Sequence, residues 1–375
     1  MRIGFVIYGS LDTLSGGYLY DRKLVEYLRS QGDTVEIISL PWRNYAAHLM
    51  DNFSFRLPHV VASRSAATLA PPARAGGQSP DDQFDVLIQD ELNHPSLILA
   101  NQGEHPYPIV SLVHHLRCSE LRPKWQNTFY RLIERKYLQS VDAFIFNSRT
   151  TAKVVNDLIE ERKLSVIAYP PTDRFGDPIS QAEIRDRAQT SPLRILFLGN
   201  VIYRKGLHTL LQAVSTQPAA FCVDVVGSLT TEPAYVKLMQ ELIAQKNLSS
   251  SVFLHGSLDA EPLIEKLRQA HVLVVPSSYE GFGIVYLEGM CFGLPAIGTT
   301  VGAASEVIEH ERTGYLIAPD DEASLAAHLT SLAEDRGLLT RLSLNARERY
   351  LRQPKWEKTA ASIREFLHTM TRQAL

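Results

Sequence analysis

Short blocks of apolar residues recur along the first half of the chain, and each block ends at a glycine, a proline or a polar turn. Blocks of this length, rich in β-branched side chains, are typical of strands buried on both faces of a parallel sheet. They cover residues 3–8, 34–40, 84–90, 108–113, 141–148 and 166–169. Segments with helical apolar spacing, such as the one carrying Leu19, Leu24 and Leu28, lie between them. The pattern predicts alternating strands and helices.

The alternation starts again near residue 193. Blocks at residues 193–199 and 221–227 repeat the order seen at the N-terminus, with a polar loop and a helix between them. Further blocks follow at residues 252–256, 272–275, 295–298 and 314–317, and a helical tail starts at Asp320. A strand–loop–helix–strand unit of this kind has its ligand edge at the loop. We therefore predict an α/β protein with two Rossmann-like, doubly wound parallel sheets.

Length and composition favour two domains joined by a linker. A chain of 375 residues exceeds what one hydrophobic core usually supports. Residues 172–192 are polar and broken by glycine and proline, so we expect a linker there between domains at residues 1–171 and 193–350. Residues 351–375 predict a C-terminal helix, with packing back on the N-terminal domain as one arrangement. Residues 56–83 lack an apolar period and predict a long loop.

Charge and cysteine content argue against several classes of protein. The net charge of −3 gives no global field for nucleic acid, so we expect no nucleic-acid partner. Cys118, Cys222 and Cys291 are scattered, without metal-ligand spacing or an obvious disulfide framework, which suits a reducing cytoplasm. The first seven residues indicate a strand rather than a signal peptide, and no apolar run approaches roughly 18 residues. We expect a cytoplasmic location.

Two glutamates, Glu280 and Glu288, follow the apolar block at residues 272–275 and lie eight residues apart. The chain between them turns through a Gly-Phe-Gly loop into a helix. Eight helical residues rise about 12 Å, so the two carboxylates cannot share one metal ion but can hold hydroxyl groups at opposite ends of a ligand. The free N–H groups of the helix N-terminus favour negative charge between them. A nucleotide-sugar has these groups in this order; in the alternative interpretation, Glu280 caps the helix and Glu288 is solvated.

A second candidate site lies in the loop after the block at residues 193–199. Arg204 and Lys205 come directly before Gly206 and a predicted helix. Adjacent cations at a helix N-terminus favour an anion through charge and helix dipole together, and two or three charge-assisted hydrogen bonds could hold a diphosphate. In the alternative interpretation, both cations face solvent.

The N-terminal blocks carry weaker signals of the same kind. Gly16 and Gly17 stand at a helix start and would let backbone N–H groups approach an anion, or they form a turn needed only for packing. His114 and His115 follow the block at residues 108–113, at the usual ligand edge of an α/β sheet, where one of them is a candidate ligand group and a structural role is the alternative. Neither half carries GxGxxG followed by a ribose-binding acid, which argues against a nicotinamide oxidoreductase.

Taken together, these motifs resemble the retaining glycosyltransferases of family 4, which have the GT-B fold. The resemblance covers essentially the whole chain, and residues 276–288 are its most specific segment. It implies an active site in a cleft between the two domains, with the acceptor on the N-terminal side and the nucleotide-sugar on the C-terminal side. The implied reaction moves a hexose-type sugar from a nucleotide-diphosphate sugar to a hydroxyl acceptor with retention of anomeric configuration.

The resemblance also implies a role for each residue of the C-terminal motifs. Glu280 would contact hydroxyls of the transferred sugar near its anomeric centre, Glu288 would bind the ribose hydroxyls, and Lys205 would hold the diphosphate. Backbone amides would line the donor sugar at Gly281, Phe282 and Gly283.

On the N-terminal side the resemblance places Gly16 and Gly17 at the phosphates and His114 beside the sugar. One position departs from the family pattern, which usually has arginine directly after the glycine where this chain has Asn200. Asparagine brings no positive charge to a departing diphosphate. Arg204 is the candidate for the missing charge, and without it turnover would be slow or the donor unusual.

We expect no metal and no cofactor other than the donor substrate, because no Asp-x-Asp motif stands at a predicted strand end. Charge that builds on the leaving diphosphate would be stabilised by Lys205, Arg204 and the helix N-terminus. Two alternatives share the cleft: a GT-B-like sugar-nucleotide epimerase or phosphorylase, and a weakly active or non-catalytic partner subunit, for which Asn200 is the argument.

The acceptor is a hydroxyl group whose carrier stays open: a glycan, a lipid-linked molecule or a small molecule. Residues 117–137 carry six cations against two acids, with four aromatic residues between them. This composition suits a helix in peripheral contact with anionic lipid at the inner membrane face. In the alternative interpretation, the helix is solvated and its aromatic side chains face the core.

Overall fold

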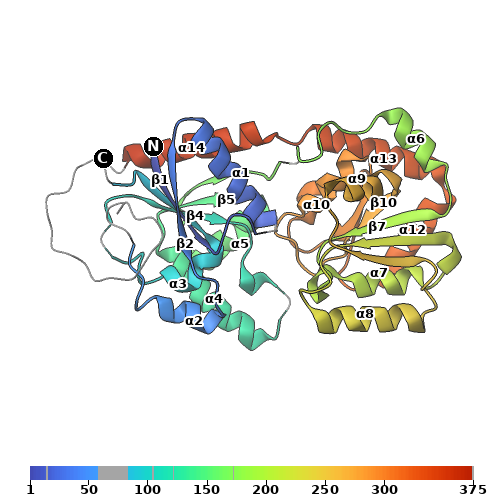
Figure 1. Ribbon diagram of the computed structural model, residues 1–375, viewed down its shortest axis with the longest axis horizontal. Helices are drawn as coiled ribbons and strands as arrows, with labels where there is room; N and C mark the ends of the chain where they lie inside the picture. The colour runs from blue at the N-terminus through green and yellow to red at the C-terminus, as the bar shows by residue number, and fades with distance from the viewer. Residues whose placement is uncertain (14–15, 58–82, 104, 121, 172, 374–375) are drawn as a thin grey trace.

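The structure is a computed structural model that describes residues 1–13, 16–57, 83–103, 105–120, 122–171 and 173–373. Two parallel sheets lie side by side with helices packed around each (Figure 1). We call the parts built on them the N-terminal half and the C-terminal half. The predicted α/β class with two doubly wound sheets is confirmed. The predicted loop at residues 56–83 lies, for residues 58–82, outside the described residues.

The N-terminal sheet has six parallel strands in the order β2-β1-β3-β4-β5-β6. All residues of its central strands β3, β4 and β5 are buried, as their continuous apolar sequence predicts. The elements are β1 (Arg2–Tyr8), α1 (Gly16–Ser30), β2 (Thr34–Leu40), α2 (Tyr45–Asp51), β3 (Val86–Asp90), η2 (Glu91–Asn93), α3 (His94–Leu97), β4 (Ile109–Val113), η3 (Arg117–Ser119), α4 (Lys124–Gln139), β5 (Ala143–Phe146), α5 (Arg149–Ile159) and β6 (Leu164–Ile167).

The C-terminal sheet also has six parallel strands, in the order β12-β11-β10-β7-β8-β9. Its elements are α6 (Gln181–Ala188), β7 (Leu193–Leu198), η4 (Tyr203–Lys205), α7 (Leu207–Val214), η5 (Pro218–Ala220), β8 (Phe221–Val226), α8 (Pro233–Gln245), β9 (Val252–Gly256), α9 (Ala260–Gln269), β10 (Val272–Val274), α10 (Ile284–Cys291), β11 (Ala296–Thr299), α11 (Ala304–Val307), β12 (Gly314–Ile317), α12 (Glu322–Glu334) and α13 (Arg336–Leu351). No helix among the described residues combines the length and apolarity needed to cross a membrane.

Strand order places a topological switch point in each sheet. In the N-terminal sheet the chain leaves β1 for β2 on one side and returns to β3 on the other; in the C-terminal sheet β7 has β8 on one side and β10 on the other. Loops diverge at such a point, and ligands of open α/β sheets bind in the crevice that forms there. A ligand site is therefore expected at the loops after β1, β3, β7 and β10.

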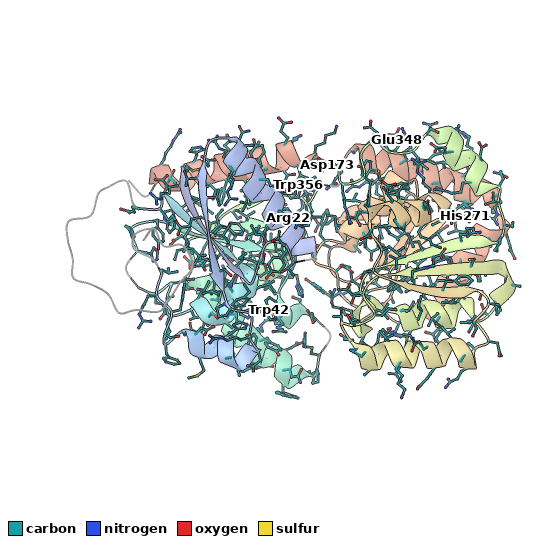
Figure 2. The ribbon with its side chains drawn as sticks, in the orientation of Figure 1. Arg22, Trp42, Asp173, His271, Glu348 and Trp356 are labelled. Atoms are coloured by element: carbon teal, nitrogen blue, oxygen red, sulfur yellow. The ribbon has the colours of Figure 1, made fainter. Side chains whose placement is uncertain are left out.

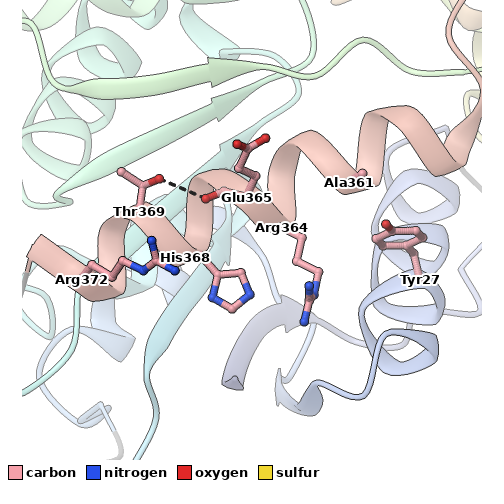
Figure 3. A pocket seen from close by; sticks show the side chains of 7 residues that line it. All are labelled: Tyr27, Ala361, Arg364, Glu365, His368, Thr369 and Arg372. Atoms are coloured by element: carbon pink, nitrogen blue, oxygen red, sulfur yellow. Dashed lines mark hydrogen bonds between the residues drawn. The ribbon is translucent and has the colours of Figure 1, made fainter.

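The C-terminal helix α14 (Trp356–Gln373) leaves the C-terminal half and packs along α1 in the N-terminal half (Figure 1). Trp356 lies with its ring 4.9 Å from that of Tyr20 on α1 (Figure 2). Further along, Asp33 accepts hydrogen bonds from Nε of Arg364 at 2.6 Å and from the N-terminal ammonium of Met1 at 2.8 Å. Figure 3 shows the residues that line a pocket between α14 and Tyr27 of α1, among them Arg364.

Asp33 is expected to hold α14 in place through this charge network. Burial alone would raise the pKa of Asp33, but the hydrogen bonds and charges of Arg364 and the N-terminus outweigh burial and lower it below its ordinary value. A lowered pKa contributes stability above the unfolded value and loses it as the pH falls through the folded value. We predict that Asp33→Asn lowers the free energy of unfolding by about 1–3 kcal/mol at pH 7, measured by urea titration, with a smaller difference below roughly pH 4.

The matched control is Asp157→Asn, which makes the same chemical change in an exposed pair with Lys153 and should change stability by less than about 0.5 kcal/mol. Equal effects of the two substitutions would contradict the role given to Asp33.

Candidate functional site

The loops at the two switch points face one another between the halves. Gly281, in the loop after β10, lies so close to the end of β4 that a Cβ there would be 2.6 Å from the carbonyl oxygen of His114. Ser148 of the N-terminal half donates a hydrogen bond to the Gly281 carbonyl at 3.1 Å. Gly16, at the start of α1, would place a Cβ 3.8 Å from Ile284 at the start of α10. The structure therefore brings the N-terminal glycines and His114 to the same place as the Gly281–Gly283 turn.

Glu306 on α11 fastens this contact between the halves. Its carboxylate accepts hydrogen bonds from the backbone N–H groups of Arg149 at 3.0 Å and Thr150 at 2.7 Å, and from the Thr150 hydroxyl at 2.6 Å. These groups form the first turn of α5, where unpaired N–H groups and the helix dipole favour a carboxylate. One half thus caps a helix of the other, an interaction that no local sequence pattern indicated.

Glu280 and Lys205 form a buried ion pair at the centre of the C-terminal loops. The Ser277 hydroxyl donates to the same Glu280 oxygen at 2.6 Å, and the Glu280 carbonyl accepts from Ala303 N–H at 2.8 Å. Burial favours the neutral form of the carboxyl group, but the charges of Lys205 and Arg204 outweigh it and lower the pKa of Glu280. Burial lowers the pKa of Lys205 against the opposing effect of Glu280. The pair is therefore largely withdrawn from solvent, with the two side chains 14% and 9% exposed.

Arg204 and Gly206 join the two C-terminal loops to one another. The Arg204 guanidinium donates to the Tyr279 carbonyl at 2.8 Å, and the Arg204 carbonyl accepts from Ser278 N–H at 2.8 Å. Gly206 has a φ of +73°, and a Cβ there would lie 2.2 Å from the Pro276 carbonyl oxygen, so only glycine permits this approach. In the same loop, the side-chain oxygen of Asn200 accepts a hydrogen bond from Ser228 N–H at 3.3 Å. The loop that carries Lys205 is therefore positioned by the loop that carries Glu280.

Glu288 lies in the second turn of α10 and is only 4% exposed. The N-cap of α10 is Gly283, with no side-chain hydrogen bond. The alternative in which Glu280 caps the helix and Glu288 is solvated is therefore wrong. Arg174, from the segment between the sheets, contacts Glu288 with 3.1 Å between Nη1 and Oε1. Burial raises the pKa of Glu288, and Arg174 opposes that rise.

His114 is held by acidic groups of two different elements. Its Nε2 lies 3.0 Å from Oδ1 of Asp21 on α1, and its backbone N–H donates to Glu91 at 2.9 Å. A Cβ on Gly17 would lie 3.3 Å from the imidazole ring. His115 instead pairs with Glu120 at 2.8 Å. Sequence analysis did not predict Asp21 or Glu91, although Glu91 directly follows a predicted strand.

Asp21 and Asp90 form a buried carboxyl pair behind His114. Each has one oxygen, Oδ2, with no hydrogen-bond partner among the described residues. Burial raises the pKa of Asp21 to about 7 and raises that of Asp90 well above its ordinary value, so one proton shared between them fits the geometry. One ligand atom each from Asp21, Asp90 and His114 would also lie within 4.8 Å of one another, a spacing open to a metal ion.

The two sheets have the arrangement of known GT-B enzymes. Sucrose-phosphate synthase from Thermosynechococcus elongatus superposes with a TM-score of 0.79 at 20% sequence identity, covering 99% of both chains. Alr3699/HepE from Anabaena, solved in complex with UDP and glucose, gives a TM-score of 0.72 at 17% identity and covers 98% of this chain and 100% of its own. At this level of identity, the likeness establishes the fold.

Sequence comparison establishes the family. Residues 20–170 match the model of Glycosyltransferase Family 4, and residues 180–349 match that of Glycosyl transferases group 1. D-rhamnosyltransferase WbpZ of Pseudomonas aeruginosa is 30% identical over 266 residues, which cover 65% of this chain and 67% of that protein. The chain belongs to this family of GT-B glycosyltransferases.

Other relatives differ in length. Glycogen synthase of Mycobacterium tuberculosis is 30% identical over 277 residues, 72% of this chain and 64% of the relative. D-inositol 3-phosphate glycosyltransferase of Xylanimonas cellulosilytica is 28% identical over 241 residues, 61% of this chain and 57% of the relative. The chain thus spans less than two thirds of these two proteins.

The carboxyl pair behind His114 generates a pH-dependent prediction. The pKa of Asp21 is raised to about 7 in the folded protein, so the folded state holds this proton more tightly than the unfolded state. Asp21 therefore lowers the free energy of unfolding progressively as the pH rises from about 4 to 7. Asn at this position has no charge to bury. We predict that the stability of Asp21→Asn relative to the original protein increases over this range, by at most about 1.4 kcal/mol per pH unit, and then levels off.

Urea titrations followed by tryptophan fluorescence measure this difference, since all three tryptophans (Trp42, Trp125 and Trp356) lie in or against the N-terminal half. Asp157→Asn is again the exposed control. If the difference in free energy of unfolding between Asp21→Asn and the original protein stayed constant between pH 4 and 7, Asp21 would be ionised throughout this range.

Proposed function

We propose that this protein transfers a sugar from a nucleotide-diphosphate sugar to a hydroxyl acceptor with retention of anomeric configuration and without a metal ion. The observation that carries the proposal is the position of Glu280, Lys205 and Glu288 around the N-terminus of α10, next to His114 of the other half. Family membership supports it independently.

The donor would lie along the α10 N-terminus. Glu280, in the loop before α10, would accept hydrogen bonds from the sugar hydroxyls, and Glu288, in the second turn of α10, from the ribose hydroxyls. The diphosphate would lie between them, against Lys205 and the backbone N–H groups of Gly281, Phe282 and Gly283. Gly16 and Gly17 would bring the start of α1 to the phosphates, and His114 would lie beside the sugar. A Cβ on Gly16 would meet only Ile284, at 3.8 Å, so the space beside this glycine supports a close backbone approach.

In the proposed reaction, the acceptor oxygen attacks the anomeric carbon from the face of the leaving group. The bond from that carbon to the diphosphate breaks, and the departing phosphate oxygen takes the acceptor proton. Negative charge builds on the diphosphate, so donors fixed in a dry site lower the barrier. Lys205 would provide the main charge. Arg204, which lies close enough to lower the pKa of Glu280, would supply the charge that Asn200 lacks.

A donor screen tests the proposal. UDP-, GDP-, ADP- and TDP-sugars are incubated with the protein, and donor hydrolysis is measured with and without acceptor. Release of the nucleoside diphosphate with inversion of the sugar, or no release with any donor, would refute it. Product analysis also separates transfer from epimerisation and phosphorolysis.

Substitutions of the ion pair test the site. We predict that Lys205→Ala and Glu280→Ala each reduce transfer by at least about 100-fold, because each removes a group aimed at the leaving group or the sugar. The circular dichroism spectrum should stay unchanged. Lys266→Ala is the matched control, since it breaks the pair with buried Asp224 in the same half without touching the loops. If either Lys205→Ala or Glu280→Ala transferred sugar at the original rate, the role proposed for that residue would be wrong.

We also propose that helix α4 contacts an anionic membrane surface and brings the protein to a lipid-linked acceptor. Trp125, Phe129 and Leu132 are 72%, 44% and 58% exposed and lie on one face of the helix. Exposed Lys124 and Arg131 flank them. Tyr137 is buried, so the alternative in which the aromatic side chains face the core is right for Tyr137 and wrong for Trp125 and Phe129. Exposed apolar and basic side chains on one helix face support interfacial binding.

Co-sedimentation with vesicles tests this surface. We predict that the protein sediments with phosphatidylglycerol vesicles at low salt and that the triple change of Trp125, Phe129 and Leu132 to serine reduces the bound fraction several-fold. Leu238→Ser, at a position 57% exposed on α8 of the C-terminal half, is the control and should bind normally. No binding by the original protein to anionic vesicles would exclude the membrane contact.

A further inference from the structure

Arg174 reaches from the segment between the two sheets to the carboxylate of Glu288. The Nη1–Oε1 distance is 3.1 Å, the Glu288 side chain is 6% exposed and that of Arg174 is 46% exposed. The neighbouring Asp173 is labelled in Figure 2, where it lies between the halves. Arg174 is the only cation that makes an ion pair with Glu288 among the described residues.

Aromatic packing fixes the position of the arginine. Its guanidinium lies 4.9 Å from the ring centre of Phe175. That ring is 5.6 Å from the ring of Phe292, which directly follows the last turn of α10. Arg174 is thus held against the helix that carries Glu288 by contacts that do not involve Glu288.

The chemistry of a ribose contact depends on the ionisation of Glu288. An ionised carboxylate accepts hydrogen bonds at both oxygens and can take both hydroxyls of a vicinal diol, with the strength of charge-assisted bonds. A neutral carboxylic acid uses one oxygen as a donor and loses this pattern. Burial favours the neutral form of Glu288, and the nearby arginine favours the ionised form. A buried carboxylate that has lost its cation would accept the diol poorly.

We propose that Arg174 is a positioning residue that keeps Glu288 ionised and oriented to accept the two ribose hydroxyls of a nucleoside diphosphate. The inference rests on the proposed function, since it assumes that Glu288 binds ribose. Arg174 lies outside both sheets, so recognition of the ribose depends on the segment that joins the halves. A purely structural role, in which the arginine only fastens this segment, would leave hydroxyl recognition unchanged.

Calorimetric titration separates these roles. UDP, GDP and ADP are each compared with the 2′,3′-dideoxy form of the same nucleotide. For the nucleotide that binds, the original protein should bind the ribose form at least about tenfold more tightly. Arg174→Gln should reduce this ratio to about threefold or less, mainly by weakening binding of the ribose form. Arg174→Lys should restore most of the ratio, because it returns the charge.

Glu288→Gln should bind the ribose and dideoxy forms about equally, so that the ratio of their affinities falls to about one. Adding Arg174→Gln to this variant should not change the ratio further. The matched control is Arg352→Gln, which breaks an exposed pair with Glu309 in the same half and should leave the ratio unchanged. If Arg174→Gln is unstable, Phe175→Leu keeps the arginine but removes the ring beneath it and should still lower the ratio.

Three outcomes would overturn the inference. A normal ratio in Arg174→Gln, with both nucleotides weakened equally, would show that the arginine is only structural. A ratio near one in the original protein would remove the ribose role of Glu288 but leave nucleotide binding intact. Binding of none of the nucleotides would overturn the proposed function as well.

Discussion

The buried contact between Lys205 and Glu280 is the interaction on which the rest of the site depends. Each residue lies in the loop at the end of a different strand, and the two side chains are only 14% and 9% exposed. A buried charge without a partner costs several kcal/mol, so the two loops must meet for either charge to exist there. Gly206 permits this approach because any side chain would collide with the Pro276 carbonyl. The position of the Lys205 ammonium group is thus set by the loop that carries Glu280.

Close contacts also join the N-terminal half to the C-terminal half. Gly281 passes next to the His114 carbonyl where no Cβ could fit, and Glu306 satisfies N–H groups of α5 that would otherwise lack partners. The first contact is steric and the second consists of directional hydrogen bonds, so together they restrict how the halves can be arranged. The chain also crosses between the halves twice, once near Arg174 and once before α14; Arg174 pairs with Glu288, and Arg364 within α14 pairs with Asp33. Ligand groups on the two sheets are therefore positioned together.

Local pattern was sufficient for much of the fold. Continuous apolar blocks predicted the twelve strands of the described residues within a few residues. The reason is clearest for β3, β4 and β5, because strands whose residues are all buried have few polar positions. The Ser148 cap of α5 was also predictable, since its hydroxyl bonds the backbone only three residues on. Candidate positions such as Glu280 and Lys205 stood out because loops at strand ends hold ligand groups in every open α/β sheet. The order of strands, however, is not encoded in any one block.

By itself, the sequence determined the α/β class, the repetition of the strand pattern and a short set of candidate residues around Glu280 and Glu288. These depend on periodicity and on spacing within one loop or helix, which involve near neighbours. Only the tertiary structure decided that Lys205 pairs with Glu280, that Asp21 and Asp90 stand behind His114, and that Arg174 reaches Glu288. Those partners are 75, 93 and 114 residues apart for the pairs Lys205–Glu280, Asp21–His114 and Arg174–Glu288. Two charged side chains form an ion pair only when folding brings them within a few ångströms of one another and removes them from solvent. The sequence around each residue does not determine either condition.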